Sequence, residues 1–161
     1  MHFVLTPITR ADAEAISRWR YGGPYSIYDG TPASVDSLLE PRYRYHSVHD
    51  VGDLAGYFCF GEDARVLAGK RLGVYEREPA LDVGLGMRPD LTGKGLGEYF
   101  VRAGLRFALD AYSPPVFRLT VATFNSRAIS VYEKVGFEPL ETFGAFKGDG
   151  EKEWLLMRRG V

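Results

Sequence analysis

The stretch from Leu81 to Gly97 constrains the fold of this chain more than any other part of it. Its sequence, LDVGLGMRPDLTGKGLG, predicts an apolar strand, a turn that contains proline, and a glycine run that opens directly into an amphipathic helix. The first amides of a helix lack internal partners and carry the positive end of its dipole, so this order predicts an anion site. Gly93, Gly95 and Gly97 let a ligand approach the main chain closely.

The sequence excludes two other kinds of phosphate loop. The P-loop of nucleoside triphosphatases requires Ser or Thr after Gly-Lys, whereas here Gly95 follows Lys94. A dinucleotide fingerprint requires an acidic residue at the end of the next strand, and the predicted strand at 117–122 is followed by Thr-Phe-Asn. A plain glycine turn that only joins strand to helix remains the simplest alternative.

Two sequence blocks resemble the GNAT acetyltransferase superfamily. The segment Thr92–Gly97, TGKGLG, is similar to that family's acyl-CoA pyrophosphate loop. The segment Asn125–Phe137, NSRAISVYEKVGF, is similar to the family's next motif, which has an Asn, a short helix with Tyr, and a closing Gly-Phe. The resemblance covers residues 80–138 and implies acetyl-CoA as the cofactor. Thr92 stands where the family commonly has Gln or Arg, so the main-chain amides are expected to hold the pyrophosphate.

The order of predicted elements indicates one α/β domain over residues 1–161, with a mixed, mostly antiparallel sheet. The family resemblance implies helices on both faces and two central strands that splay apart to form an acyl-CoA cleft. Residues 19–28 are rich in aromatics and broken by Gly and Pro, and predict no regular element. The expected elements are strands at 3–7, 43–48, 54–60, 81–87, 116–122, 138–146 and 152–158, a short strand in the irregular stretch 61–79 at 72–75, a turn at 148–150, and helices after Thr9, Ser34, Gly97 and Asn125.

Composition narrows the functional class. The chain has 20 basic and 21 acidic residues, which gives no electrostatic reason to expect nucleic acid binding. Cys59 is the single cysteine, so no intrachain disulfide can form, and a reducing compartment is predicted. No apolar run approaches membrane-spanning length, and the first residues lack the features of a signal peptide. We therefore expect a cytoplasmic monomer or homodimer without a metal or a membrane partner.

Acyl transfer from a thioester to an amine needs a held cofactor, a polarised carbonyl, a neutral amine and a proton donor for the leaving thiolate. Tyr132 is the predicted acid, because a phenol with a pKa of about 10 stays protonated at neutral pH. The alternative is that Tyr132 only packs in the core, and Asn125 is equally suited to cap a helix. The resemblance assigns cofactor contacts to Met87, Arg88, Thr92, Gly93, Lys94, Gly95, Leu96, Gly97, Glu98, Asn125 and Tyr132.

The general base is not identified by the sequence. Asp82 is the best carboxylate, because strand periodicity puts it on one face with Gly84 and Gly86. Those two glycines leave room for a ligand or for a closely packed helix. The alternatives are a purely structural role for Asp82, a base among Glu76 and Glu78, or a water molecule.

Four aromatic residues, Trp19, Tyr21, Tyr25 and Tyr28, lie where the resemblance implies the acceptor-binding wall, although they could merely cover a sheet edge. We expect transfer of acetyl from acetyl-CoA to a primary amine of a small molecule, a protein N-terminus or a lysine, by direct attack in a ternary complex. The alternatives are an acyl-CoA sensing module without turnover, and another chemistry that uses the glycine loop for a different phosphate ligand.

Overall fold

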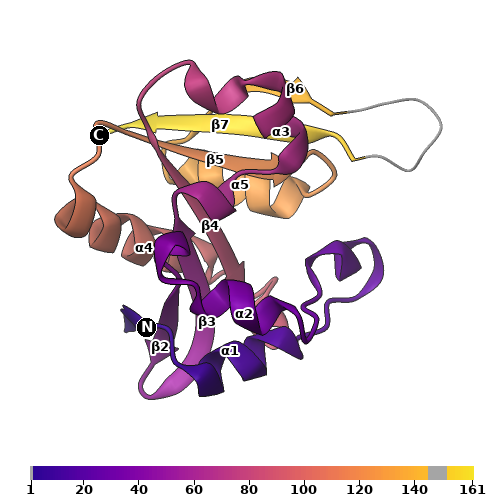
Figure 1. The fold of residues 1–161 in the computed structure, drawn as a ribbon, viewed down its shortest axis with the longest axis vertical. Helices are drawn as coiled ribbons and strands as arrows, with labels where there is room; N and C mark the ends of the chain where they lie inside the picture. Colours follow the sequence, from indigo (N-terminus) through magenta and orange to yellow (C-terminus); the bar gives the residue numbers. More distant parts are fainter. Residues whose placement is uncertain (1, 145–151) are drawn as a thin grey trace.

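A computed structural model describes residues 2–144 and 152–161 (Figure 1). Its seven strands form one sheet in the order β1-β2-β3-β4-β5-β7-β6, in which only β4 and β5 run parallel. Helices α1 and α2 lie on one face and α4 and α5 on the other (Figure 1). This confirms the α/β fold with a mixed, mostly antiparallel sheet. The strands are β1 (Phe3–Pro7), β2 (His46–Asp50), β3 (Asp53–Phe60), β4 (Leu81–Met87), β5 (Val116–Ala122), β6 (Glu138–Phe143) and β7 (Trp154–Gly160).

The first helix, α1 (Arg10–Ser17), begins where the sequence predicted. The Thr9 hydroxyl accepts a hydrogen bond of 3.1 Å from the Asp12 amide, which is a helix N-cap. The aromatic segment that follows is more regular than predicted, because Pro24 starts a 3-10 helix, η1 (Gly23–Tyr28). Helix α2 (Ser34–Leu39) then packs against α1.

The predicted hairpin is present as β2 and β3, joined by Val51 and Gly52, which both have positive φ. Its first strand begins at His46 rather than at residue 43, because Pro41 starts a 3-10 helix, η2 (Pro41–Tyr43). The sequence expectation was wrong in the next stretch, where residues 72–75 form no strand. Instead α3 (Leu67–Leu72) ends at Gly73, whose left-handed conformation provides the helix C-cap. Val74 and Tyr75 then lie buried beside Phe143.

The central strands separate soon after they meet. Strands β4 and β5 pair only through Leu81 with Phe117 and Asp82 with Arg118. Beyond these pairs β4 stays with β3 and β5 stays with β7, and the two halves of the sheet diverge (Figure 1). The splayed strands that the resemblance implied are therefore present. Helices α4 (Gly97–Tyr112) and α5 (Ser126–Lys134) flank the opening.

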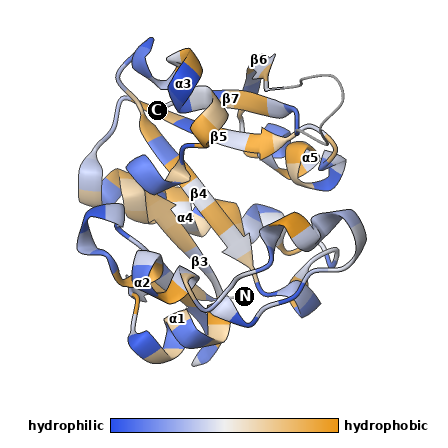
Figure 2. Ribbon diagram, turned by 45° about the vertical axis from the view of Figure 1, so that its right-hand side comes forward, coloured by the Kyte–Doolittle hydropathy of each residue, from blue (hydrophilic) through white to orange (hydrophobic). Residues whose placement is uncertain are grey.

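The core lies between the sheet and α4. Phe58 stacks on Phe100 with ring centroids 4.9 Å apart. A Cβ at Gly104 would lie only 2.2 Å from the Phe58 ring, so this glycine lets α4 approach β3 closely. Apolar residues gather along β3, β4 and β5 (Figure 2). The predicted turn at 148–150 and residues 145–146 of the predicted strand 138–146 lie outside the described residues, whereas the strand predicted at 152–158 begins at Trp154.

Within the described residues no helix is long and apolar enough to cross a membrane.

Candidate active site

A cavity of about 630 Å³ occupies the opening between β4 and β5. Its volume falls in the usual range for small-molecule sites. The walls come from β4, the loop after it, the first turn of α4, α5, and tyrosines of the N-terminal half. Of the predicted cofactor contacts, those that line it are Met87, Thr92, Gly93, Gly95, Gly97, Glu98, Asn125 and Tyr132.

The loop before α4 presents a row of free amides. The N–H groups of residues 93–99 donate to no acceptor within the described part of the chain, and α4 begins without a side-chain cap. Gly93 and Gly95 have φ values of +73° and +78°, which L side chains rarely adopt. Because these amides also lie at the positive end of a 16-residue helix, the loop can hold a diphosphate.

The edge of β4 that faces the cavity offers peptide groups in alternation. Asp82 accepts from Gly61 and Arg88 donates to Ala55, so the even-numbered residues direct their backbone groups toward β3. The odd-numbered residues Leu85 and Met87 therefore direct theirs toward the opening. An extended ligand arm can pair with that edge as an added strand would.

Arg88 does not line the cavity, although it was expected to contact the cofactor. Its amide donates to the Ala55 carbonyl at 2.8 Å, and its side chain binds Asp90 and the Leu54 carbonyl. The expected cofactor contact of Arg88 was therefore wrong, because strand alternation directs the Met87 amide, and not the Arg88 amide, toward the opening. Lys94 and Leu96 do not line the cavity.

A basic residue that the sequence reasoning did not assign reaches the glycine loop. Arg127 lines the cavity, and its Nη1 would lie 3.0 Å from a Cβ added at Gly93. Its guanidinium also lies 4.7 Å from the centre of the Tyr25 ring. Thr92, by contrast, donates its hydroxyl to the Pro89 carbonyl. The available signal was a basic side chain two residues after Asn125, at the start of a helix that faces the loop.

Tyr132 is buried in the wall of the cavity, with 9% of its surface exposed. Its hydroxyl bonds to no other described residue. The hydroxyl oxygen keeps some solvent-accessible surface, and Tyr132 lines the cavity, so a ligand in the cavity can reach this oxygen. Burial raises the pKa of this phenol above its usual value, and a negative charge on Tyr28 would raise it further. The phenol therefore stays protonated at neutral pH.

Asn125 links the two sides of the cavity. Its Oδ1 accepts from the Ala128 amide at 3.1 Å, which caps α5. Its Nδ2 donates to the Tyr28 hydroxyl at 3.2 Å. The capping role that the sequence left open is thus present, together with a contact to η1.

The four predicted acceptor residues separate into three positions. Tyr25 lines the cleft cavity only, and Trp19 lines only a second, neighbouring cavity. Tyr21 and Tyr28 line both cavities. The Tyr21 hydroxyl donates to the Met87 carbonyl at 2.6 Å, so this side chain ties the N-terminal half to the free edge of β4.

Asp82 is held in a buried ion pair. It is 1% exposed, and its two oxygens accept from Arg118 Nε at 2.6 Å and Arg118 Nη2 at 2.9 Å, with Arg65 Nε at 2.7 Å. It does not line the cleft cavity. The same holds for Glu76 and for Glu78, which binds Arg158. The geometry favours the structural alternative for Asp82, because a base must reach the reacting amine.

The space beside Gly84 and Gly86 is filled by β3 rather than left open. A Cβ at Gly86 would lie 2.4 Å from the Tyr57 ring, and one at Gly84 would lie 2.6 Å from the Cys59 sulfur. The expectation of ligand room on that face was wrong. The alternative of a closely packed helix holds in part, because Ala64 of the 3-10 helix η3 (Glu62–Ala64) would lie 3.3 Å from a Cβ at Gly84. Tyr57, which the sequence reasoning did not single out, lines both cavities as a result.

Comparison with known proteins gives a family match over most of the chain. Residues 2–138 match the family described as Acetyltransferase (GNAT) domain. Mycothiol acetyltransferases from Streptomyces avermitilis and Streptomyces coelicolor are 37% and 36% identical over 91 residues. That stretch is 56% of this chain and 29% of each relative, so the match covers less than a third of those proteins.

Solved structures give the same fold at low identity. The crystal structure of a putative phosphinothricin N-acetyltransferase superposes with a TM-score of 0.74 and 18% identity over 99% of both chains. AAC(6')-Ib in complex with ribostamycin and coenzyme A superposes with a TM-score of 0.73 and 18% identity, over 99% of this chain and 94% of the other. A spermidine N-acetyltransferase SpeG chimera from Vibrio cholerae and hSSAT superposes with a TM-score of 0.72 and 18% identity, over 99% of this chain and 96% of the other.

Proposed function

The chain belongs to the GNAT acetyltransferase family, and we propose that it transfers an acetyl group from acetyl-CoA to a primary amine by direct attack in a ternary complex. The observation that carries the proposal is the junction of two features in one cavity. The unpartnered amides of residues 93–99 meet the unpaired edge of β4 there. A small-molecule amine is the proposed acceptor, since the relatives named above include acetyltransferases of mycothiol and spermidine.

The residues present fit the cofactor. The amides of residues 93–99 and the Arg127 guanidinium suit a diphosphate, and Leu85 and Met87 suit an arm that carries amide groups. When bound, acetyl-CoA would supply the activated thioester. Met87 and Leu85 direct their N–H groups into the opening, where they would stabilise negative charge on the acyl oxygen of the bound thioester.

Tyr132 acts as the acid in this proposal. The acceptor nitrogen attacks the acetyl carbon, an N–C bond forms, and the C–S bond breaks. Tyr132 gives its phenolic proton to the departing sulfur and recovers one from solvent. In this proposal the surplus proton of the amine passes to water. The three carboxylates considered as a base, Asp82, Glu76 and Glu78, lie outside the cavity, and Glu98, which lines it, belongs to the first turn of α4 beside the diphosphate site.

Release of free thiol tests the function directly. The protein is mixed with acetyl-CoA and a panel of amines and peptides, and thiol is followed with and without acceptor. Acceptor-dependent release supports the transferase. Tight binding of acetyl-CoA without release across the panel would contradict it and favour the sensing module. Failure to bind acetyl-CoA would overturn both.

Arg127 gives a prediction for cofactor affinity. Arg127→Gln removes one charge-assisted contact, so the Kd of coenzyme A should rise about 10-fold. The Kd of pantetheine, which lacks the diphosphate, should not change. Titration calorimetry with both ligands measures this, and Arg106→Gln, on the exposed face of α4, is the matched control. An equal loss for both ligands would show that Arg127 does not contact the diphosphate.

A further inference from the structure

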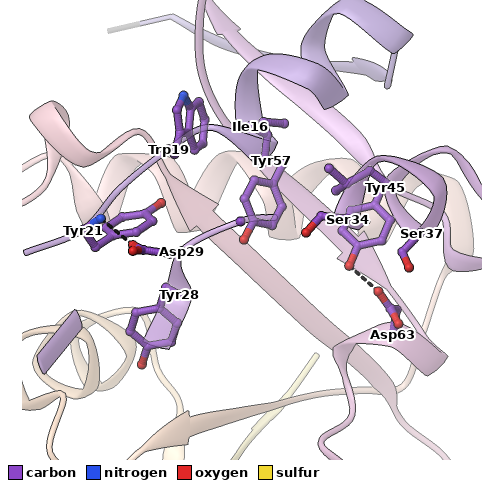
Figure 3. A pocket seen from close by; sticks show the side chains of 12 residues that line it. Ile16, Trp19, Tyr21, Tyr28, Asp29, Ser34, Ser37, Tyr45, Tyr57 and Asp63 are labelled. Carbon is purple, nitrogen blue, oxygen red and sulfur yellow. Dashed lines mark hydrogen bonds between the residues drawn. The ribbon is translucent and has the colours of Figure 1, made fainter. Parts of the chain in front are cut away.

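A second cavity, of about 280 Å³, adjoins the cleft (Figure 3). Tyr21, Tyr28 and Tyr57 line both cavities, so they form the boundary between them. Tyr45 and Asp63 line the second cavity only and mark its far end. The volume is near the lower limit for small-molecule sites, which suits a short, slender ligand.

The charged groups of this cavity are all negative. Asp29 lies near Tyr21 and Tyr28, and Asp63 lies beside Tyr45 at the other end (Figure 3). No Lys or Arg lines the cavity within the described residues, and neither carboxylate is in an ion pair there. A positive ligand would therefore meet two carboxylates without competition from a protein cation.

Each carboxylate keeps one oxygen available. Asp29 Oδ1 accepts from the Tyr21 amide at 2.6 Å, and Asp63 Oδ2 accepts from the Tyr45 hydroxyl. Within the described residues nothing donates to the other oxygen of either group. The bonds that exist fix the orientation of the carboxylates, and the remaining oxygens can accept from an ammonium group.

Aromatic rings form the walls between the two carboxylates. Tyr57 lies between Trp19 and Tyr45, with ring centroids 6.2 Å and 6.0 Å away (Figure 3). Aromatic faces attract cations and also cover the methylene groups of an aliphatic chain. Aromatic walls with an acidic group at each end suit an aliphatic chain that carries two amino groups.

We propose that the acceptor is a short aliphatic diamine, held by its second, positively charged amino group at Asp63. This inference rests on the proposed function, because it assigns the acceptor of that reaction. The reacting amine lies at the boundary formed by Tyr21, Tyr28 and Tyr57, where it faces the cleft as a neutral nitrogen. The other amine stays protonated beside Asp63 and does not take part in bond changes.

Binding and turnover with matched amines test the proposal. Butane-1,4-diamine and butylamine have the same chain length and differ by one ammonium group. For the unaltered protein, titration calorimetry in the presence of coenzyme A should show the diamine binding about 10-fold more tightly, the value of one charge-assisted contact. Asp63→Asn should weaken diamine binding about 10-fold and leave butylamine unchanged, because Asn still accepts from Tyr45. Asp36→Asn, on the exposed face of α2, is the control and should change neither.

The outcomes separate this inference from the transferase proposal. Equal affinity of the unaltered protein for the diamine and butylamine would overturn the diamine assignment, whatever the variant does. The same applies if Asp63→Asn lowers both affinities equally. Thiol release with butylamine at the same kcat/KM as with the diamine would leave the transferase intact and remove the subsite. Diamine binding without thiol release from any amine would support the subsite and contradict the transferase.

Discussion

Tyr132→Phe should lower kcat by about 100-fold and leave the Kd of acetyl-CoA nearly unchanged. The substitution removes only the hydroxyl, which bonds to no other described residue, so neither the packing nor a hydrogen bond of the fold is lost. The expected size is that of one general acid. Steady-state kinetics with a saturating amine measure it. Tyr112→Phe, which removes a hydroxyl at the last residue of α4 and outside both cavities, is the control and should retain the rate.

The pH profile gives an independent check on Tyr132. The neutral phenol is the proton donor, so activity falls when pH rises through its pKa. Burial raises that pKa above the usual 10.0, and the donor therefore persists as pH rises to that value. The log of kcat against pH should show no descending limb up to pH 10.0. A descending limb below that value, absent from the Phe variant, would contradict the raised pKa.

Asp82→Asn should lower the free energy of unfolding by about 3–5 kcal/mol, the cost of leaving a buried charge without its partner. Arg118 is 1% exposed and has Asp82 as its ionic partner, with further bonds to the carbonyls of Tyr75 and Glu78. Urea unfolding without ligand measures the loss. The control is Asp110→Asn, at an exposed position near the end of α4, which should change the free energy of unfolding by less than about 0.5 kcal/mol.

The same variant decides between the two roles that the sequence left open for Asp82. If Asp82 is structural, kcat of the folded fraction at low temperature should stay within about threefold of the unaltered enzyme. A general base would instead be worth about 100-fold or more in kcat. A large loss of kcat with unchanged unfolding free energy would restore Asp82 to the mechanism.

Local signals made much of the site predictable. The glycine run 93–97, the strand before it and the N-cap at Asn125 each depend on residues that are adjacent in sequence. The structure has all three. Gly73 also acts locally, because it forms the C-cap of helix α3, whereas the sequence predicted a short strand at 72–75. Short elements of this kind lack the length that makes periodicity decisive.

Other features depend on partners that are distant in sequence. Asp82 and Arg118 are 36 residues apart, and only the β4–β5 pairing joins them. The direction of the Arg88 amide depends on which neighbour pairs with β4, which the strand sequence alone does not state. Tyr57 and Asp63 likewise become cavity residues only once β3 lies beside the N-terminal helices. Predicting these positions requires the register of the sheet as well as the pattern of each strand.

The parting of β4 from β5 also bears on self-association. Unpaired strand edges invite other polypeptides to add a strand, and proteins commonly shield them at the margin of a sheet. Here the unpaired edge lies in the middle of the sheet, recessed between α4 and α5 and bridged by the Tyr21 contact to Met87. Side chains of α4, α5 and the N-terminal tyrosines surround this recess, so an approaching strand would meet them before it reached the β4 edge. The chain thus keeps peptide groups ready for recognition without the aggregation hazard that an open edge carries.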